Sequence, residues 1–254
     1  MDLWLPPILA PVGTYDLVRL GRERDGGYLV DPLSVAASTR LISFGMQDDW
    51  SFEQAFRESN AVPVDIFDHT VDRDYFFREA YHYLLRWDRF DKIRAQFRTY
   101  LSFRRFFRDD VRHHSVWIGY DWPNRAKSLQ IVLDEYADPG DRIFLKIDIE
   151  SWEYRITDQI IANADRIEGI TIEFHHLDLL MPRLLDFVAC LPLHLCHIHA
   201  NNSGGVDDHG TPLVLELSFS RHAPQDPARP NLPHPLDAQN YAHFTPYQLK
   251  FRDT

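Results

Sequence analysis

The hydrophobic and polar positions form short apolar runs separated by longer amphipathic stretches, which is typical of strands that alternate with helices. The clearest run covers residues 143–149, where Ile, Phe and Leu follow the turn signal Pro139–Gly140–Asp141. A run of this kind predicts a strand buried on both faces of a parallel sheet. It leads into the acids Asp148, Glu150 and Glu153. Ligands of open α/β sheets bind beyond the carboxyl ends of the strands, so these acids indicate either a working site or a strand that has reached the surface.

The same pattern recurs along the chain and predicts an α/β fold with one domain over residues 1–254. Its first 20 residues, which hold several prolines, predict a loosely structured segment. The predicted strands are 28–30, 40–45, 62–67, 111–119, 143–149, 168–174, 193–199 and 211–220, and the predicted helices are 50–59, 128–136, 152–163 and 179–191.

Two segments depart from this alternation. Residues 70–112 interleave aromatic residues with arginines and contain neither glycine nor proline, which predicts a helical insertion. Such an insertion fits a cap over an anionic or carbohydrate substrate as well as it fits an oligomer contact. Residues 221–254 form a proline-rich tail, and we expect it to wrap over the domain and to add no strand.

Composition excludes several classes of function. The net charge of −11 argues against binding to a nucleic-acid backbone. No apolar run is long enough to span a bilayer, and the first residues do not resemble a signal peptide. Cys190 and Cys196 are most simply free thiols in a reducing cytoplasm. We therefore expect a cytoplasmic protein without a nucleic-acid partner or a membrane span.

A nucleoside site is indicated by the strand at residues 40–45. It ends at Gly45 and leads into a helix, and a glycine at such a turn lets backbone N–H groups meet a ligand. Asp68 ends the next strand, close to the roughly 20 residues expected between that turn and a ribose-binding acid. A turn at residues 25–27 is either a plain hairpin turn or a second close approach of the backbone to a ligand.

Four strand ends should meet at one edge of a parallel sheet: Gly45, Asp68, the pair Asp148 and Glu150, and the pair Glu173 and His175. Carboxylates and imidazoles gathered in this way either bind a divalent metal or form an acid–base pair. The alternative is a set of hydrogen-bonded core histidines beside solvated acids.

Several motifs resemble the FkbM-type S-adenosylmethionine-dependent methyltransferases, namely LISFGMQDDWSFE, VDIFD, FLKIDIESWEY, ITIEFHHLD and HIHANNSGG. The resemblance extends from about Arg22 to Ser220. It departs from the family at Ser151, where a glycine is usual, and at the first motif, which keeps only Gly45. It implies a Rossmann-like, seven-strand class I methyltransferase sheet that is mostly parallel with its last strand antiparallel.

The resemblance also implies the cofactor and the site. S-adenosylmethionine would bind with its methionine end near Gly45, its ribose at Asp68 and its adenine near His69, while Asp148 closes the pocket. The residues expected to bind it are Tyr28, Gly45, Gln47, Asp48, Phe52, Asp68, His69 and Asp148.

The expected activity is methylation of a sugar hydroxyl in a saccharide, polysaccharide or glycoconjugate. His175 is the expected base, with Glu150 as a second catalytic group. Mg²⁺ or Mn²⁺ held by Asp148, Glu173 and His199 would assist. The alternatives are a metal-dependent hydrolase or isomerase that uses the same acids, and a non-catalytic assembly protein. Residues 70–112 would be the contact of a homo-oligomer.

Overall fold

The computed structural model describes residues 1–71, 75, 78, 81, 90–123 and 125–252. Within these residues one mixed sheet has the strand order β11-β12-β10-β9-β4-β5-β6. β12 is antiparallel to both of its neighbours, and the other pairings are parallel. This is the predicted Rossmann-like sheet of seven strands, mostly parallel with its last strand antiparallel. Its strands are β4 (Arg40–Phe44), β5 (Val64–Phe67), β6 (Val111–His114), β9 (Ile143–Ile147), β10 (Ile167–Phe174), β11 (His194–Ala200) and β12 (Leu215–Ser220).

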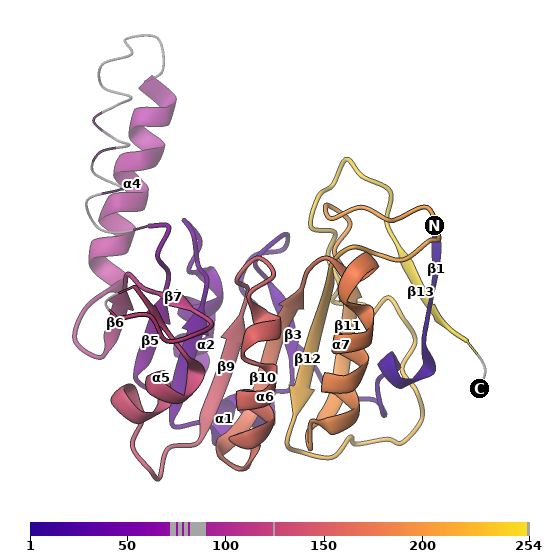
Figure 1. The fold of residues 1–254 in the computed structure, drawn as a ribbon. Coiled ribbons are helices and arrows are strands. Elements are labelled where there is room, and N and C mark those ends of the chain that lie inside the picture. Colours follow the sequence, from indigo (N-terminus) through magenta and orange to yellow (C-terminus); the bar gives the residue numbers. More distant parts are fainter. Residues whose placement is uncertain (72–74, 76–77, 79–80, 82–89, 124, 253–254) are drawn as a thin grey trace.

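Helices cover both faces of this sheet (Figure 1). Every residue of β9 and β10 is buried, as expected of central strands between two helical layers. One hydrophobic cluster packs beneath α5 (Leu129–Tyr136), α6 (Thr157–Ala162) and α7 (Leu177–Cys190). The other packs beneath α1 (Pro32–Ala37) and α2 (Ser51–Ser59).

The predicted helix at 152–163 is divided. A single 3-10 turn, η2 (Glu153–Arg155), comes first and α6 follows it. The Ile156 N–H donates to the carbonyl oxygen of Glu153, and the Glu153 side chain is fully buried.

The chain termini correct two expectations. β1 (Asp2–Leu5) pairs in parallel with β13 (Gln248–Phe251), so the first residues are ordered and the proline-rich tail does contain a strand. The two termini thus lie on the same side of the molecule (Figure 1). The apolar positions Leu3, Leu5 and Leu249 of this pair are buried, and their burial explains why the pairing holds.

Several smaller elements lie outside the seven-stranded sheet. β2 (Val18–Leu20) and β3 (Tyr28–Val30) form an antiparallel hairpin around the predicted turn. The predicted strand at 111–119 is interrupted, because β6 ends at His114 and β7 (Trp117–Ile118) pairs with β8 (Ala126–Lys127) instead. Two further 3-10 turns are η1 (Pro7–Leu9) and η3 (Ala164–Arg166).

Helix α4 (Phe90–Phe106) projects away from the sheet (Figure 1). Its last turns are anchored by Phe103, which is buried and packs edge-on against Trp50. The helix lies within residues 70–112, where the sequence predicts a helical insertion. Residues 72–74, 76–77, 79–80 and 82–89 lie outside the described residues, so the roles expected of 70–112 remain predictions. Among the described helices, none combines the length and the apolar character that crossing a membrane requires.

Candidate functional site

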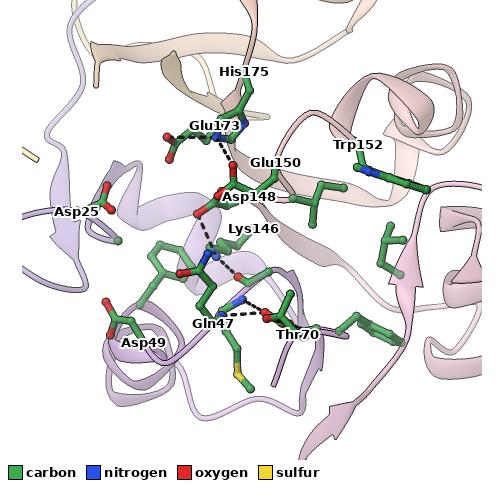
Figure 2. Close-up of a pocket in the computed structure, with 18 of the residues that line it drawn as sticks. Asp25, Gln47, Asp49, Thr70, Lys146, Asp148, Glu150, Trp152, Glu173 and His175 are labelled. Carbon is green, nitrogen blue, oxygen red and sulfur yellow. Dashed lines mark hydrogen bonds and ion pairs between the residues drawn. The ribbon is translucent and has the colours of Figure 1, made fainter. Parts of the chain in front are cut away.

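A cavity of about 730 Å³ opens at the carboxyl ends of the central strands (Figure 2). Most of the predicted site residues line it, and the exceptions are Tyr28 and His199. Those that line it are Gly45, Gln47, Asp48, Phe52, Asp68, His69, Asp148, Glu150, Glu173 and His175.

The glycine turn after β4 is fixed by both neighbouring strands. Gly45 has a φ of 79°, in the left-handed region that favours glycine. Its N–H donates to the Phe67 carbonyl oxygen over 3.0 Å. Its own carbonyl oxygen accepts a hydrogen bond from the ammonium group of Lys146. Lys146 is buried and belongs to β9, so it links the turn to that strand. No role was predicted for it from the sequence.

Asp68 organises the loop that follows this turn. One carboxylate oxygen accepts the N–H groups of Met46 and Gln47, each at 2.8 Å. The other accepts the Thr70 N–H at 2.7 Å and the Thr70 hydroxyl at 2.6 Å. Burial raises the pKa of Asp68, but these hydrogen bonds outweigh it and the pKa is lowered. The carboxylate is thus ionised and already has four donors from the chain. Its contact with a ribose remains a prediction.

Flat side chains line one end of the cavity. The rings of His69 and Trp117 are stacked with centroids 3.5 Å apart, and the Trp152 ring lies 5.0 Å from that of Trp117. Such surfaces suit a planar purine. His69 was expected here from the sequence, whereas Trp117 and Trp152 were not. Trp152 could have been found from its place two residues after Glu150.

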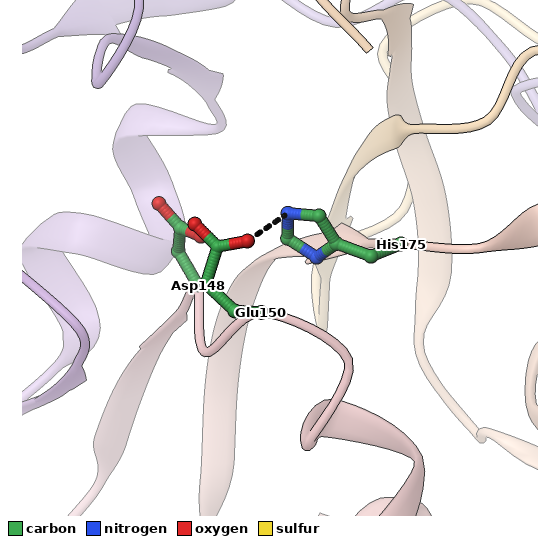
Figure 3. A group of neighbouring side chains, drawn as sticks. All are labelled: Asp148, Glu150 and His175. Atoms are coloured by element: carbon green, nitrogen blue, oxygen red, sulfur yellow. Dashed lines mark ion pairs between the residues drawn. The ribbon is translucent and has the colours of Figure 1, made fainter.

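Acids and a histidine occupy the other end. Asp148, Glu150 and His175 bring one ligand atom each to within 4.8 Å of one another (Figure 3). The His175 Nε2 lies 3.6 Å from a Glu150 carboxylate oxygen. The opposite ring nitrogen, Nδ1, lies 2.9 Å from Glu153. Two oxygens and one nitrogen suit Mg²⁺ or Mn²⁺, and the same three groups suit proton transfer.

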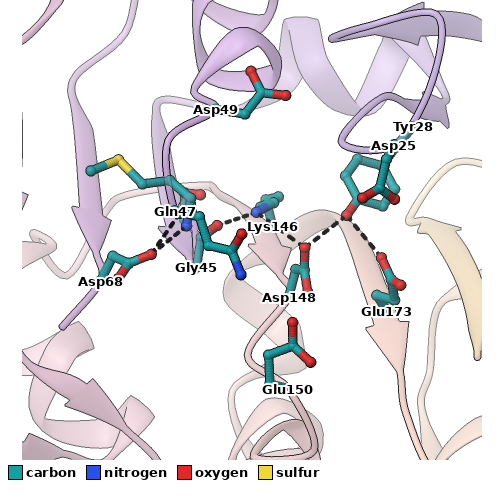
Figure 4. A network of polar contacts seen from close by, with 12 residues as sticks. Asp25, Tyr28, Gly45, Gln47, Asp49, Asp68, Lys146, Asp148, Glu150 and Glu173 are labelled. Atoms are coloured by element: carbon teal, nitrogen blue, oxygen red, sulfur yellow. Dashed lines mark hydrogen bonds and ion pairs between the residues drawn. The ribbon is translucent and has the colours of Figure 1, made fainter. Parts of the chain in front are cut away.

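A second group of acids lies beside the first. Asp25, Glu173 and Glu216 also approach one another within 4.8 Å. The Tyr28 hydroxyl bridges the two groups, 3.4 Å from Asp148 and 3.3 Å from Glu173 (Figure 4). Tyr28 therefore belongs to the site through its hydrogen bonds, although it does not line the cavity.

The electrostatics of this second group favour a proton on Glu173. Burial raises the pKa of Glu173 well above its usual value, and the nearby charges of Asp148, Glu216 and Asp25 raise it further. The Asn201 amide donates to both Asp25 and Glu173, at 3.3 and 2.9 Å. Neither Asp25 nor Asn201 was assigned a role from the sequence. The Asp25–Gly26–Gly27 turn and the asparagines after the strand at 193–199 were the available signals.

His199 corrects the predicted metal ligands. Its Nδ1 lies 3.5 Å from Asp237 and its Nε2 lies 3.1 Å from the side-chain oxygen of Asn240. β11 is separated from β10 by β12. Both ring nitrogens of His199 thus face the tail, and the histidine is not placed beside Asp148 as a third ligand.

No protein-family model matches the chain, and no curated protein matches it. Solved structures that match include an rRNA methylase from Streptococcus thermophilus, with 12% identity over 75% of this chain and 94% of that chain and a TM-score of 0.38. A precorrin-6y C5,15-methyltransferase from Geobacter metallireducens matches with 15% identity over 74% and 86% and a TM-score of 0.38. A human methyltransferase 10 domain containing protein matches with 9% identity over 73% of each chain and a TM-score of 0.37. At these scores the similarity carries no argument about family or activity.

Proposed function

We propose that this chain is an S-adenosylmethionine-dependent O-methyltransferase of the FkbM type that acts on a sugar hydroxyl of a saccharide, polysaccharide or glycoconjugate. The observation that supports this most strongly is the single cavity with two unlike ends. Flat rings line one end and a carboxylate–histidine group lines the other, at the carboxyl edge of a sheet with the class I strand order. This arrangement offers room for a nucleoside beside a reacting centre.

The residues present fit the cofactor. Adenine would lie against Trp117 and Trp152, whose rings line the cavity. The methionine end would lie near Gly45, where the turn between β4 and α2 brings the backbone to the cavity wall. When bound, S-adenosylmethionine supplies an electrophilic methyl group.

The acid lining favours an acceptor with several hydroxyl groups. Asp25, Asp48, Asp49 and Glu150 all line the cavity, and ionised carboxylates accept hydrogen bonds but donate none. Sugar hydroxyls are suitable donors to them. A phosphorylated or carboxylated acceptor would meet like charge. These acids therefore support a neutral polyol more than an anionic substrate.

His175 is the residue that takes the proton from the acceptor hydroxyl. With the cofactor bound, this proton would pass to Nε2, which faces the cavity beside Glu150. Burial lowers the pKa of His175, but the hydrogen bond and charge of Glu153 and the charges of Asp148 and Glu150 outweigh it, so the pKa is raised. The neutral form of a more basic imidazole is the stronger proton acceptor, while the fraction of neutral imidazole at a given pH is smaller.

A divalent cation bound at the same end of the cavity is an alternative means of activating the acceptor hydroxyl. Asp148 and Glu150 would hold it with oxygen, together with His175 or Glu173. When bound, the cation lowers the pKa of a coordinated hydroxyl. Incubation with EDTA followed by Mg²⁺ or Mn²⁺ tests this version. Activity that EDTA abolishes and Mg²⁺ or Mn²⁺ restores supports it, and activity that EDTA leaves unchanged rejects it.

Calorimetry with S-adenosylmethionine and S-adenosylhomocysteine tests the main proposal. Binding of both supports a methyltransferase. If neither ligand binds at high micromolar concentration, the proposal is wrong, and a hydrolase, an isomerase or a non-catalytic assembly protein becomes the better interpretation. Transfer of a labelled methyl group to a panel of neutral glycans then identifies the acceptor class.

Variants connect that activity to the site. His175→Ala should lower kcat by about 10²–10⁴-fold. The exposed His209 is a matched control, and His209→Ala should keep full turnover. Full turnover in His175→Ala would remove His175 from the mechanism.

A further inference from the structure

Glu153 is a fully buried acid just behind the cavity. It lies in η2, which follows β9, and it reaches across to the end of β10. One of its carboxylate oxygens accepts the His175 backbone N–H at 2.8 Å and lies 2.9 Å from His175 Nδ1. The Tyr154 hydroxyl donates to the carbonyl oxygen of His175 at 2.8 Å. Two consecutive residues of η2 thus hold the backbone and the ring of one histidine.

The location of this acid is costly to folding. Burial of a carboxylate is unfavourable unless hydrogen bonds and a positive partner compensate. The second oxygen of Glu153 is buried and has no hydrogen-bond partner among the described residues. A leucine or glutamine at this position would avoid that cost. An acid retained here is better explained by its effect on His175 than by packing.

The hydrogen bond determines which ring nitrogen carries the hydrogen. The Glu153 oxygen beside Nδ1 already accepts the His175 backbone N–H. It therefore acts as an acceptor, and the neutral His175 ring donates to it through Nδ1. Nε2 is then left without a hydrogen, as an acceptor. It faces Glu150 and Glu173 at 3.6 and 3.7 Å, on the cavity side.

We propose that Glu153 is the positioning residue of His175: it fixes the ring orientation and the Nδ1–H tautomer, so that Nε2 faces the acceptor hydroxyl as a proton acceptor. The proposal rests on the proposed function, in which His175 accepts the proton. Glu153 itself does not line the cavity and touches no reactant.

The test uses the full chain with ¹⁵N-labelled histidine. Long-range ¹H–¹⁵N NMR distinguishes the two tautomers when the imidazole is neutral, and comparison with His175→Gln assigns the signal. The wild type should show the Nδ1–H form. Glu153→Leu, which removes the oxygen beside both the backbone N–H and Nδ1, should show a mixture or the opposite tautomer. Glu153→Gln, whose side-chain oxygen can still accept both, should keep the Nδ1–H form. With a glycan from the panel, the kcat of Glu153→Leu should fall about tenfold or more, while KM changes little.

Glu168→Leu is the matched control, since Glu168 is also a buried glutamate but lies at the other end of β10. It should change neither the tautomer nor kcat, even if it lowers stability. The Nε2–H form in the wild type, or the same tautomer in wild type and Glu153→Leu, would overturn the proposal. Failure of S-adenosylhomocysteine to bind the wild type would instead overturn the proposed function, whatever the tautomer.

Discussion

The backbone carbonyl oxygen of Asp148 lies against Gly45 so closely that a Cβ built on the glycine would be 1.7 Å from it. The two residues end neighbouring parallel strands, β4 and β9. Their contact brings the glycine turn together with the acids that follow β9. The space that a side chain would need at residue 45 is already filled by backbone, and backbone cannot rotate away as a flexible side chain can.

Gly45→Ala should therefore destabilise the protein by about 2–4 kcal/mol, from the positive φ and the overlap together. It should also abolish binding of S-adenosylhomocysteine, because the turn must move. Urea unfolding and calorimetry measure the two effects. Gly140→Ala is the control, since a Cβ at Gly140 meets no atom within 4 Å. Equal stability of the two variants would contradict this view of the turn.

At Ser151 we expect a substitution to raise the free energy of unfolding, in contrast to the change at Gly45. Glu150 and Ser151 have φ values of 52° and 80°, in the left-handed region that costs residues other than glycine about 1–2 kcal/mol. The turn after the acids thus has the geometry of a glycine turn, although it carries a serine. Ser151→Gly should raise the free energy of unfolding by about 1 kcal/mol. Ser59→Gly, in helix α2, should lower it. A loss of stability in Ser151→Gly would show that the serine side chain makes a contact worth more than this strain.

Much of this site could be predicted from the sequence, because parallel strands place their carboxyl ends at one edge. That rule was enough to bring Gly45, Asp68, Asp148 and Glu173 together. It failed for His199, because an antiparallel strand lies between β11 and β10, and that order comes from long-range pairing. Glu153 was missed for a different reason. It stands three and seven residues before Ile156 and Ile160, on the apolar face of the predicted helix. An acid on such a face is unusual, so the pattern alone assigned it no role.

The raised carboxyl pKa values predict that stability falls with rising pH. Burial raises the pKa of Glu216 to about 7 and that of Glu173 well above 4.5. In the unfolded chain both acids ionise near their usual value of 4.5, so the folded state holds more protons above that pH. The free energy of unfolding should therefore decrease as the pH rises from about 4.5 through about 7.

Glu173→Gln should reduce this decrease, because glutamine resembles the protonated acid and does not ionise. Urea unfolding over this pH range provides the measurement. The exposed Glu58 offers a control, and Glu58→Gln should keep the wild-type slope. An unchanged slope in Glu173→Gln would mean that Glu173 is not a source of the pH dependence.

The proline-rich tail contributes one buried residue to the acid group, and this leads to the last prediction. The Asn240 amide donates to Asp25 at 3.1 Å and to Glu216 at 2.6 Å, and its oxygen lies 3.1 Å from His199 Nε2. Asn240 is 5% exposed. It therefore bridges the exposed Asp25 and the buried Glu216, two acids that would otherwise face each other without a donor between them.

Asn240→Ala should destabilise the protein by about 1–3 kcal/mol, the usual cost of leaving buried polar groups without a partner. Asn240→Asp should cost more, since it replaces the donor with a further acid beside Asp25 and Glu216. Thermal and urea unfolding compare these variants with Asn231→Ala, a change at an exposed asparagine of the same tail. If Asn240→Ala and Asn231→Ala are equally stable, the tail does not hold the acid group together. If Asn240→Asp is the more stable of the two Asn240 variants, a cation shared by the acids becomes the better explanation of how they tolerate one another.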